Sequence, residues 1–213
     1  MSNDDPRRDS PAAQRNAPPI LAQLQQSLPA QGVMLELASG TGQHAALFSA
    51  GLPGWQWQPT DLQADALASI NAHCAGLARV WPALRLDVLD RAWPAELPVA
   101  VDAMFCANLI HIAPWACTGA LMQGAGRQLA AQGVLVTYGP YLEDDVPTAP
   151  GNRAFDADLR SRNSEWGLRR LADVAVQAHA AGLGLRTRVA MPANNLLLVW
   201  ARSQPEEGTP ARG

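Results

Sequence analysis

The stretch Val33-Met34-Leu35-Glu36-Leu37-Ala38-Ser39-Gly40-Thr41-Gly42 decides the fold of this chain. Its first five residues are apolar apart from Glu36 and follow a glycine, which is typical of a buried strand. A turn with two glycines comes next, and residues 43–50 then have the pattern of a helix that ends at Gly51. Glycines let the backbone approach a ligand closely, and the first turn of a helix offers free N–H groups. The stretch therefore predicts a strand, turn and helix that bind a nucleotide-like ligand.

Glu36 makes the predicted ligand more specific. A carboxylate at the end of a strand can accept hydrogen bonds from a hydroxyl or amino group, whereas it would repel a pyrophosphate. The run resembles motif I of the class I S-adenosylmethionine (SAM) methyltransferases, in which an acid is followed by x-Gly-x-Gly-x-Gly. Ala38 stands at the first of these glycines, while Gly40 and Gly42 match. For this signal alone, a tight turn in any α/β protein is the alternative.

Two further carboxylates follow later predicted strands. Asp61 comes nineteen residues after Gly42, where a carboxylate can accept from both hydroxyls of a ribose or can instead cap the next helix. The methyltransferase resemblance implies that Asp87 accepts the adenine amino group and that Val88 donates its backbone N–H to the ring; an ordinary loop aspartate is the alternative. Because parallel strands end at one edge of a sheet, these acids are expected in one crevice with Glu36, where they would also attract a sulfonium cation.

Apolar segments alternate with helical patterns along the chain, which predicts a parallel sheet with right-handed crossovers. Strands are expected at 33–37, 55–59, 83–86, 99–107, 134–138, 185–191 and 196–201, and helices at 20–28, 43–50, 65–74, 114–129, around 155–159 and at 168–178. The last two strands are joined by Pro192-Ala193-Asn194-Asn195, a link too short for a parallel crossover. The methyltransferase resemblance implies a Rossmann-like α/β fold, with a seven-stranded, mostly parallel sheet whose last strand is reversed and helices on both faces. A nicotinamide-binding Rossmann domain would usually end with another parallel unit.

Length and composition indicate one domain without lysine chemistry. The 213 residues are expected to comprise a flexible arm at 1–14, a domain at 15–202 and a disordered tail at 203–213. All sixteen basic residues are arginine, which excludes a lysine nucleophile, a Schiff base and a Walker A lysine. The net charge of −3 gives no global attraction for nucleic acid.

The cysteines and the N-terminus favour a cytoplasmic protein. Three cysteines show neither a metal-ligand spacing nor an even number, so we expect reduced core thiols and no metal. The polar, charged N-terminus does not resemble a signal peptide. Residues 103–126 contain no charged side chain, but Asn108, His111 and Pro114 interrupt them, which predicts strand, loop and helix rather than a membrane span.

Asn108-Leu109-Ile110-His111 follows the fourth predicted strand. The resemblance implies that this run lies beneath the methyl group, with Asn108 beside the cofactor. His111 is the candidate general base, because imidazole can remove a proton near neutral pH; a structural histidine is the alternative. Tyr138 and Tyr141 flank the exit of the fifth strand and could line the same mouth, with Tyr141 as a second catalytic candidate. His44 is expected to serve packing or loop binding.

Arginines are concentrated between the fifth strand and the final hairpin, and Arg162 is among them. We expect Arg15 and Arg162 to face the mouth of the site and to favour an acceptor with a carboxylate or phosphate; solvated or locally paired arginines are the alternative. Asn16 is expected to form a lid with Arg15, and Trp115 and Trp166 are the tryptophans expected to edge the pocket.

From about Ser10 to Arg202 the chain also resembles a narrower family, the methyltransferase-like domain of unknown function 938. The matching runs are Ser10–Asn16, Glu36–His44, Phe105–Trp115, Tyr138–Tyr141, Phe155–Trp166 and Met191–Asn195. General methyltransferases lack the Gly-Pro-Tyr and Met-Pro-Ala-Asn-Asn pieces. The resemblance implies SAM as cofactor and no metal, and it does not supply a substrate. The expected cofactor-binding residues are Glu36, Ala38, Ser39, Gly40, Gly42, Asp61, Leu62, Asp87, Val88 and Asn108.

The sequence thus predicts a SAM-dependent methyltransferase that acts on a small or medium-sized acceptor, with oxygen as the candidate acceptor atom and S-adenosylhomocysteine (SAH) as product. A SAM-binding scaffold without catalysis is the alternative. The final hairpin and Glu36 argue against a nicotinamide-dependent oxidoreductase, and the net charge argues against a nucleic-acid substrate. No membrane partner is expected, and the oligomeric state and the acceptor are not specified by these patterns.

Overall fold

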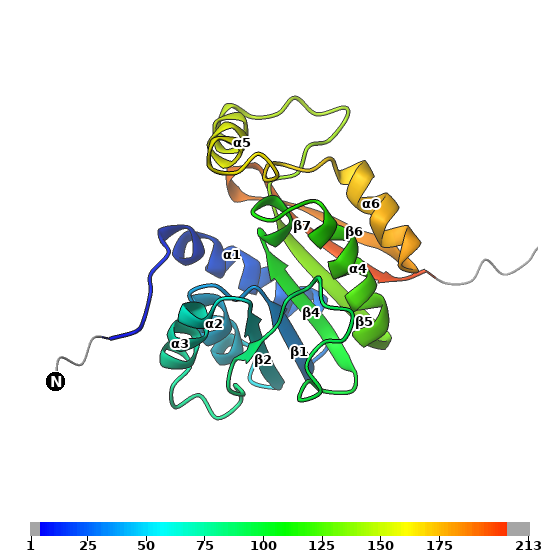
Figure 1. Ribbon diagram of the computed structural model, residues 1–213. Coiled ribbons are helices and arrows are strands. Elements are labelled where there is room, and N and C mark those ends of the chain that lie inside the picture. Colours follow the sequence, from blue (N-terminus) through cyan, green and yellow to red (C-terminus); the bar gives the residue numbers. More distant parts are fainter. Residues whose placement is uncertain (1–4, 204–213) are drawn as a thin grey trace, which may run out of the picture.

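A computed structural model describes residues 5–203 and shows one seven-stranded sheet between two layers of helices (Figure 1). The strands are β1 Gly32–Leu37, β2 Trp55–Asp61, β3 Leu84–Arg85, β4 Val101–Ala107, β5 Leu129–Gly139, β6 Leu183–Met191 and β7 Asn195–Arg202. The helices are α1 Pro11–Ser27, α2 Gln43–Gly51, α3 Ala64–His73, α4 Ala116–Gln128, α5 Pro150–Arg162 and α6 Leu171–Ala180, with short 3-10 turns η1 Leu109–His111 and η2 Pro192–Asn194.

The order of the strands is β3-β2-β1-β4-β5-β7-β6, and β7 runs antiparallel to both of its neighbours. The predicted Rossmann-like sheet with a reversed last strand is therefore confirmed. Helices α1, α2 and α3 cover one face, α4 and α6 cover the other, and α5 lies apart from these layers, above the sheet in the view of Figure 1. Because β1, β2 and β4 are parallel, their carboxyl ends lie at one edge of the sheet.

Strand β1 lies in the middle of the sheet and is buried on both faces. Leu35 and Leu37 belong to the core under α4 and α6, whereas Met34 belongs to the core under α1 and α2. A strand covered on both sides reads as a nearly continuous apolar run, which explains why this segment was recognisable in the sequence. Glu36 is the exception, and its side chain points to the same face as Met34 because side chains alternate along a strand.

Helix α1 is longer than predicted. It begins at Pro11, where the Oγ of Ser10 accepts a hydrogen bond of 3.2 Å from the backbone N–H of Ala13. Residues 11–14 of the expected flexible arm are therefore helical, and Pro18 and Pro19 lie inside the helix rather than near its start.

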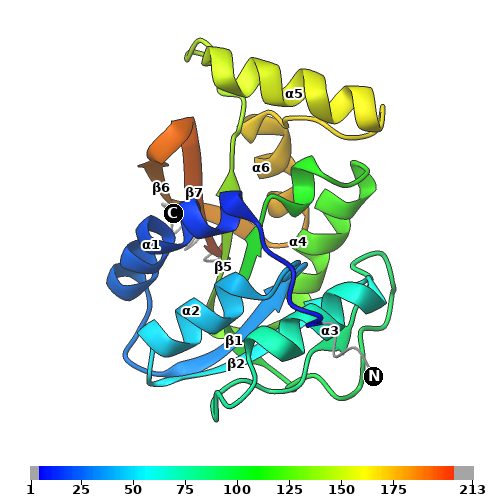
Figure 2. The same ribbon diagram turned by 90° about the vertical axis from the view of Figure 1, so that its left-hand side faces the viewer.

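The residues before α1 are hydrogen-bonded to the domain. The N–H of Arg8 donates to Ser69 Oγ and the N–H of Ser10 donates to Gln43 Oε1, each at 2.8 Å. In chain order the segment therefore passes α3 and then the start of α2 before it enters α1, as Figure 2 shows.

The ends of the chain are not described by the structure. Residues 1–4 of the expected arm and 204–213 of the expected tail lie outside the described residues. The division into arm, domain and tail stays a prediction.

Two other predictions from the sequence are confirmed. Residues 103–126 form most of β4, then η1 and most of α4, and within residues 5–203 no helix is both long and apolar enough to cross a membrane. Cys74, Cys106 and Cys117 are buried free thiols.

The turn between β1 and α2 depends on left-handed backbone. Ala38, Gly40 and Gly42 have φ values of 52°, 60° and 90°. At Gly42 a Cβ atom would lie 2.6 Å from the Cα of Ile70 in α3, so this glycine permits both the conformation and the close approach of two helices.

We expect Gly42→Ala to lower the free energy of unfolding by about 2–5 kcal/mol, because strain at positive φ adds to a clash with α3. Gly76→Ala is a matched control, since Gly76 has a φ of 82° but no atom of residues 5–203 would lie within 4 Å of the added Cβ. Its expected cost is about 1–2 kcal/mol. Urea unfolding followed by tryptophan fluorescence measures both, and equal losses would contradict the packing role of Gly42.

Candidate functional site

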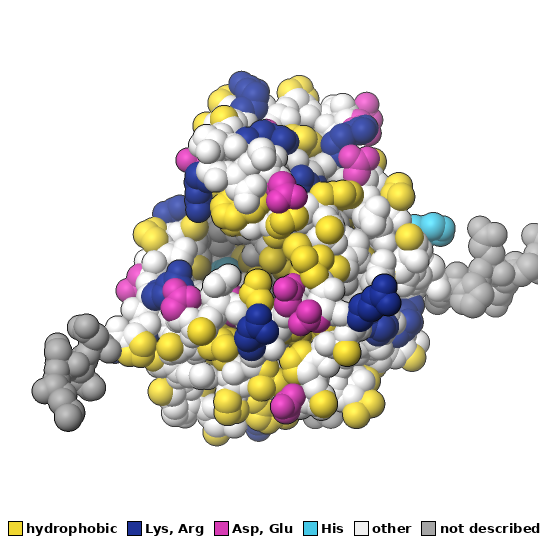
Figure 3. Space-filling view, viewed as in Figure 1, with side chains coloured by type: hydrophobic (Ala, Val, Ile, Leu, Met, Phe, Trp, Pro, Cys, Tyr) yellow, Lys and Arg dark blue, Asp and Glu magenta, His cyan; other side chains and the backbone are white. Residues whose placement is uncertain are grey.

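A cavity of about 700 Å³ opens at the carboxyl ends of β1, β2 and β4. Its wall is formed by the turn after β1, the ends of β2 and β4, the loop after β3, the first half of α1 and the segment after α5. Figure 3 shows the surface hollowed here, with hydrophobic side chains around the opening. Its volume is in the range of about 300–1,000 Å³ that is typical of small-molecule sites.

Asp61 joins the end of β2 to the glycine turn. Its Oδ2 accepts a hydrogen bond of 2.9 Å from the N–H of Gly40, and its Oδ1 accepts one of 3.0 Å from the N–H of Gln63, which precedes α3. Each carboxylate oxygen has a further lone pair, so Asp61 can still accept from a ligand in the cavity. The binding and helix-start roles of Asp61 are therefore compatible.

The turn satisfies most of its own N–H groups. Ser39 N donates to Thr60 O at 2.9 Å, Gly40 N donates to Asp61, and Gly42 N donates to Ser39 O at 3.0 Å. These N–H groups therefore stabilise the turn instead of forming an anion-binding nest.

Asp87 and Val88 lie in the cavity wall directly after the strand β3 and Leu86. Oδ1 of Asp87 accepts a hydrogen bond of 2.9 Å from the N–H of Leu89, which fixes the carboxylate in the loop. The wall therefore carries two carboxylates, one from β2 and one from the loop after β3.

Most of the predicted cofactor-binding residues line this cavity. Those that do are Ala38, Ser39, Gly40, Asp61, Leu62, Asp87, Val88 and Asn108. Glu36 and Gly42 do not: Gly42 packs against α3, and Glu36 lies beneath the turn.

Glu36 is a buried structural acid, which corrects the prediction that it contacts the ligand. Its carboxylate accepts a hydrogen bond of 2.6 Å from Trp57 Nε1, and its backbone carbonyl accepts one of 2.8 Å from Thr60 Oγ1. Burial raises the pKa of the Glu36 carboxyl to about 8. The side chain faces the core under α1 and α2 rather than the cavity, because strand alternation places it on the same face as Met34.

His111 is fully buried, so the structure does not place it as a general base in the cavity. Asn108 has a φ of 60°, and η1 then turns the chain so that the imidazole packs edge-on against Tyr141, with ring centroids 5.0 Å apart. Burial, together with the positive charge of Arg169, lowers the pKa of His111 to about 3. A Cβ at Gly139 would lie 2.6 Å from His111 Nε2, so the Gly-Pro-Tyr run accommodates this histidine. The position of His111 therefore supports the alternative given above, a structural histidine.

The two tyrosines also belong to the core, and neither lines the cavity. Tyr141 donates its hydroxyl proton to Thr137 Oγ1 at 2.8 Å, and burial raises the pKa of its phenol above the usual range. Burial raises the pKa of Tyr138 to about 12. Neither tyrosine therefore lies at the mouth of the cavity as predicted, and this position does not support the catalytic role predicted for Tyr141.

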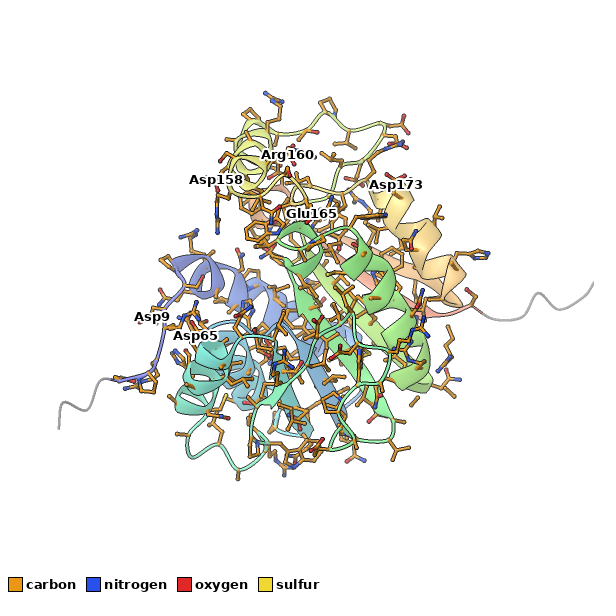
Figure 4. The ribbon with its side chains drawn as sticks, viewed as in Figure 1. Asp9, Asp65, Asp158, Arg160, Glu165 and Asp173 are labelled. Atoms are coloured by element: carbon orange, nitrogen blue, oxygen red, sulfur yellow. The ribbon has the colours of Figure 1, made fainter. Side chains whose placement is uncertain are left out.

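The residues predicted for the lid and for the edge of the pocket are only partly in the cavity wall. Asn16 and Trp166 line the cavity, whereas Arg15, Arg162 and Trp115 do not. The guanidinium of Arg162 lies 5.3 Å from the centroid of the Trp166 ring and 3.7 Å from the carboxylate of Asp158. Figure 4 shows Asp158 on α5, at the edge of the molecule above the sheet.

His44 and Asn163 line the cavity and were not predicted to do so. His44 stands in the first turn of α2, its ring stacks on Phe48 at 5.0 Å, and burial lowers its pKa to about 4, so the imidazole is neutral at neutral pH. Its position two residues after the last glycine of the turn was the signal that could have identified it. Asn163 follows α5, and its Oδ1 accepts a hydrogen bond from the N–H of Glu165. No local sequence pattern indicates that Asn163 lines the cavity.

Known proteins provide two comparisons. A family model described as "Protein of unknown function (DUF938)" matches residues 7–202. Similar solved structures include CalO1, described as a methyltransferase in calicheamicin biosynthesis in its SAH-bound form, with 19% identity and a TM-score of 0.69 over 86% of this chain and 54% of that chain.

A second similar structure is an O-methyltransferase family protein from Burkholderia thailandensis, with 20% identity and a TM-score of 0.71 over 92% of this chain and 57% of that chain. A third is an O-methyltransferase family 2 protein from Planctomyces limnophilus in complex with apigenin, with 19% identity and a TM-score of 0.73 over 90% of this chain and 58% of that chain. This chain therefore spans a little over half the length of each similar chain. At such identities the likeness shows the fold, which is that of Rossmann-like methyltransferases.

Glu36 generates a prediction on pH dependence. Between about pH 5 and pH 8 the folded chain keeps a proton on Glu36 that the unfolded chain has lost, so this residue makes the free energy of unfolding fall as pH rises through that range. Glu36→Gln removes the ionisation and keeps an oxygen for Trp57. We expect this variant to be more stable than the parent by about 1–4 kcal/mol at pH 8.5 and to show a smaller decrease from pH 5 to 8.

Urea unfolding at a series of pH values measures this difference. Glu165→Gln, which removes an exposed carboxyl, is the control and should keep the pH slope of the parent. Parallel pH profiles for Glu36→Gln and the parent would show that the buried acid does not titrate as described.

Proposed function

This chain belongs to the DUF938 family, and we propose that it is a SAM-dependent methyltransferase acting on a small or medium-sized acceptor. The observation that carries the proposal is that Asp61 and Asp87 share one cavity wall with the glycine turn. Ribose hydroxyls and an adenine amino group are hydrogen-bond donors, and carboxylates accept from them. The same two acids attract the positive charge of a sulfonium.

The wall fits SAM better than a dinucleotide. A pyrophosphate needs N–H donors or cations, yet the N–H groups of Ser39, Gly40 and Gly42 are bonded within the protein. Among residues 5–203, no arginine lines the cavity. A phosphate group would therefore face Asp61 without compensation, which argues against a nicotinamide cofactor.

SAM supplies an electrophilic methyl group on its sulfonium, so the chain has mainly to hold, orient and shield the reactants. Helix α1 and the segment after α5 extend the cavity beyond the strand ends that would hold the donor. A scaffold that only binds SAM would not need this additional space. The similar O-methyltransferase structures favour oxygen as the acceptor atom.

The proposal predicts that SAH binds and that Asp61 contributes to its affinity. Asp61→Asn removes a charged hydrogen-bond acceptor, so SAH affinity measured by isothermal titration calorimetry should fall by roughly 10- to 100-fold. Asp102→Asn is the matched control: Asp102 also accepts a backbone N–H, from Val33 at 2.8 Å, but it lies at the start of β4, outside the cavity wall. Its SAH affinity should equal that of the parent. Tight NADH binding without SAH binding would overturn the proposal.

A further inference from the structure

Part of the cavity wall carries no charged group. It comes from α1, the loop after β4 and the segment after α5, and it includes Ala12, Asn16, Leu109, Ile112, Asn163 and Trp166. Four of these side chains are apolar and two are carboxamides. The negative charges of the cavity, Asp61 and Asp87, belong to the wall assigned above to the donor.

Among residues 5–203 no arginine lines the cavity, and the two arginines at the end of α5 are paired outside it. Arg162 covers the Trp166 ring and pairs with Asp158, and Arg160 forms an ion pair of 2.9 Å with Asp156. An anionic acceptor would therefore lose its hydration without gaining a cationic partner.

Arg169 binds backbone rather than the cavity. Its guanidinium donates to the carbonyl oxygens of Ile110 at 3.0 Å and Ala113 at 2.9 Å, in the loop after β4. It also donates to the carbonyl oxygen of Glu165 at 2.6 Å, in the segment after α5. Arg169 therefore joins the two segments that carry the uncharged wall.

Trp166 is held in this wall by its neighbours. Its backbone N–H donates to the carbonyl oxygen of Asn163 at 3.0 Å, and the backbone N–H of Gly167 donates to the carbonyl oxygen of His111 at 2.9 Å. The N–H of Leu168 donates to Asp156 Oδ1 at 2.7 Å. Because the backbone on both sides is fixed, the indole is a preformed surface for a flat ligand.

The mouth of the cavity is apolar as well. Ile112, in the loop after β4, lines it although its side chain is 38% exposed. This side chain would contact an apolar body that extends outward from the uncharged wall. Figure 3 shows that other hydrophobic side chains surround the opening.

We propose that the acceptor is an uncharged molecule with a flat apolar body, and that Trp166 determines this specificity by stacking against that body. Asn16 and Asn163 can donate to and accept from its polar groups, because a carboxamide offers both. The proposal rests on the proposed function, which assigns the acidic part of the cavity to the donor. It also replaces the expectation of an acceptor with a carboxylate or phosphate bound by Arg15 and Arg162.

A matched pair of probes tests the charge preference. The two probes, 2-naphthol and 2-naphthoate, share a ring system but are neutral and anionic, respectively, at pH 7. With the protein saturated by SAH, ligand-observed NMR titration should show 2-naphthol binding at least about 10-fold more tightly. Equal or tighter binding of 2-naphthoate would overturn the proposal, and so would a lack of 2-naphthol binding.

Variants test the place of binding. Trp166→Ala should weaken 2-naphthol binding by about 10-fold and leave SAH affinity unchanged, while Trp166→Phe should keep most of the probe affinity. Trp115→Ala is the matched control, because Trp115 is 37% exposed and also has an arginine over its ring, Arg169 at 5.6 Å, but does not line the cavity. Equal losses in Trp166→Ala and Trp115→Ala, or a Trp166→Phe variant as weak as Trp166→Ala, would contradict the proposal.

The SAH measurement separates this proposal from the proposed function. Failure of the parent protein to bind SAH would refute the function, and the two probes would then be titrated against the protein alone. A preference for 2-naphthol that is lost in Trp166→Ala but kept in Trp115→Ala would still support binding of a neutral, flat molecule at the uncharged wall. A preference for 2-naphthoate would refute that proposal.

Discussion

The hydrogen bonds between the end of β2 and the turn after β1 are the constraint on which the site depends. Ser39 N donates to Thr60 O and Gly40 N donates to Asp61 Oδ2, both at 2.9 Å. These bonds continue the pairing of β1 with β2 beyond the strands and hold the left-handed turn beside the Asp61 carboxylate. Because the backbone N–H groups of Ser39, Gly40 and Gly42 are bonded within the protein, the cavity beside the turn offers mainly hydrogen-bond acceptors. Such a site favours ligands that donate hydrogen bonds or carry positive charge over phosphates.

The rest of the cavity follows from how the remaining segments are attached to this frame. Helix α1 packs through Ala17, Ile20 and Leu24 on the same face as α2 and α3, which brings Asn16 into the wall. On the other side, Arg169 joins the loop after β4 to the segment that carries Trp166. The result is an acidic wall continuous with an uncharged one, and such a division suits a cationic donor beside a neutral acceptor.

The sequence predicted the sheet and its ends better than it predicted side-chain direction. Asp61 and Asp87 follow strands that lie side by side, so their place at the carboxyl edge could be inferred from the pattern alone. The position of Glu36 was predicted wrongly because it is the penultimate residue of β1, where alternation directs its side chain into the core under α1 and α2. The position of His111 was predicted wrongly because Asn108 adopts a positive φ and starts a 3-10 turn that buries the imidazole. Asparagine is enriched at positive φ, but it also occurs in other conformations, so Asn108 alone did not predict this turn. His44 was missed although it follows the last glycine of the turn by two residues, because we expected its side chain to serve packing or loop binding.

A crystal structure of the protein with SAH tests the central claim most directly, namely that the acidic wall binds the donor and leaves the uncharged wall to the acceptor. The account predicts ribose hydroxyls within hydrogen-bond distance of Asp61, the adenine beside Asp87 and Val88, and the sulfur directed toward the wall that contains Asn16 and Trp166. An adenosine stacked on Trp166, or SAH bound outside the cavity, would contradict it.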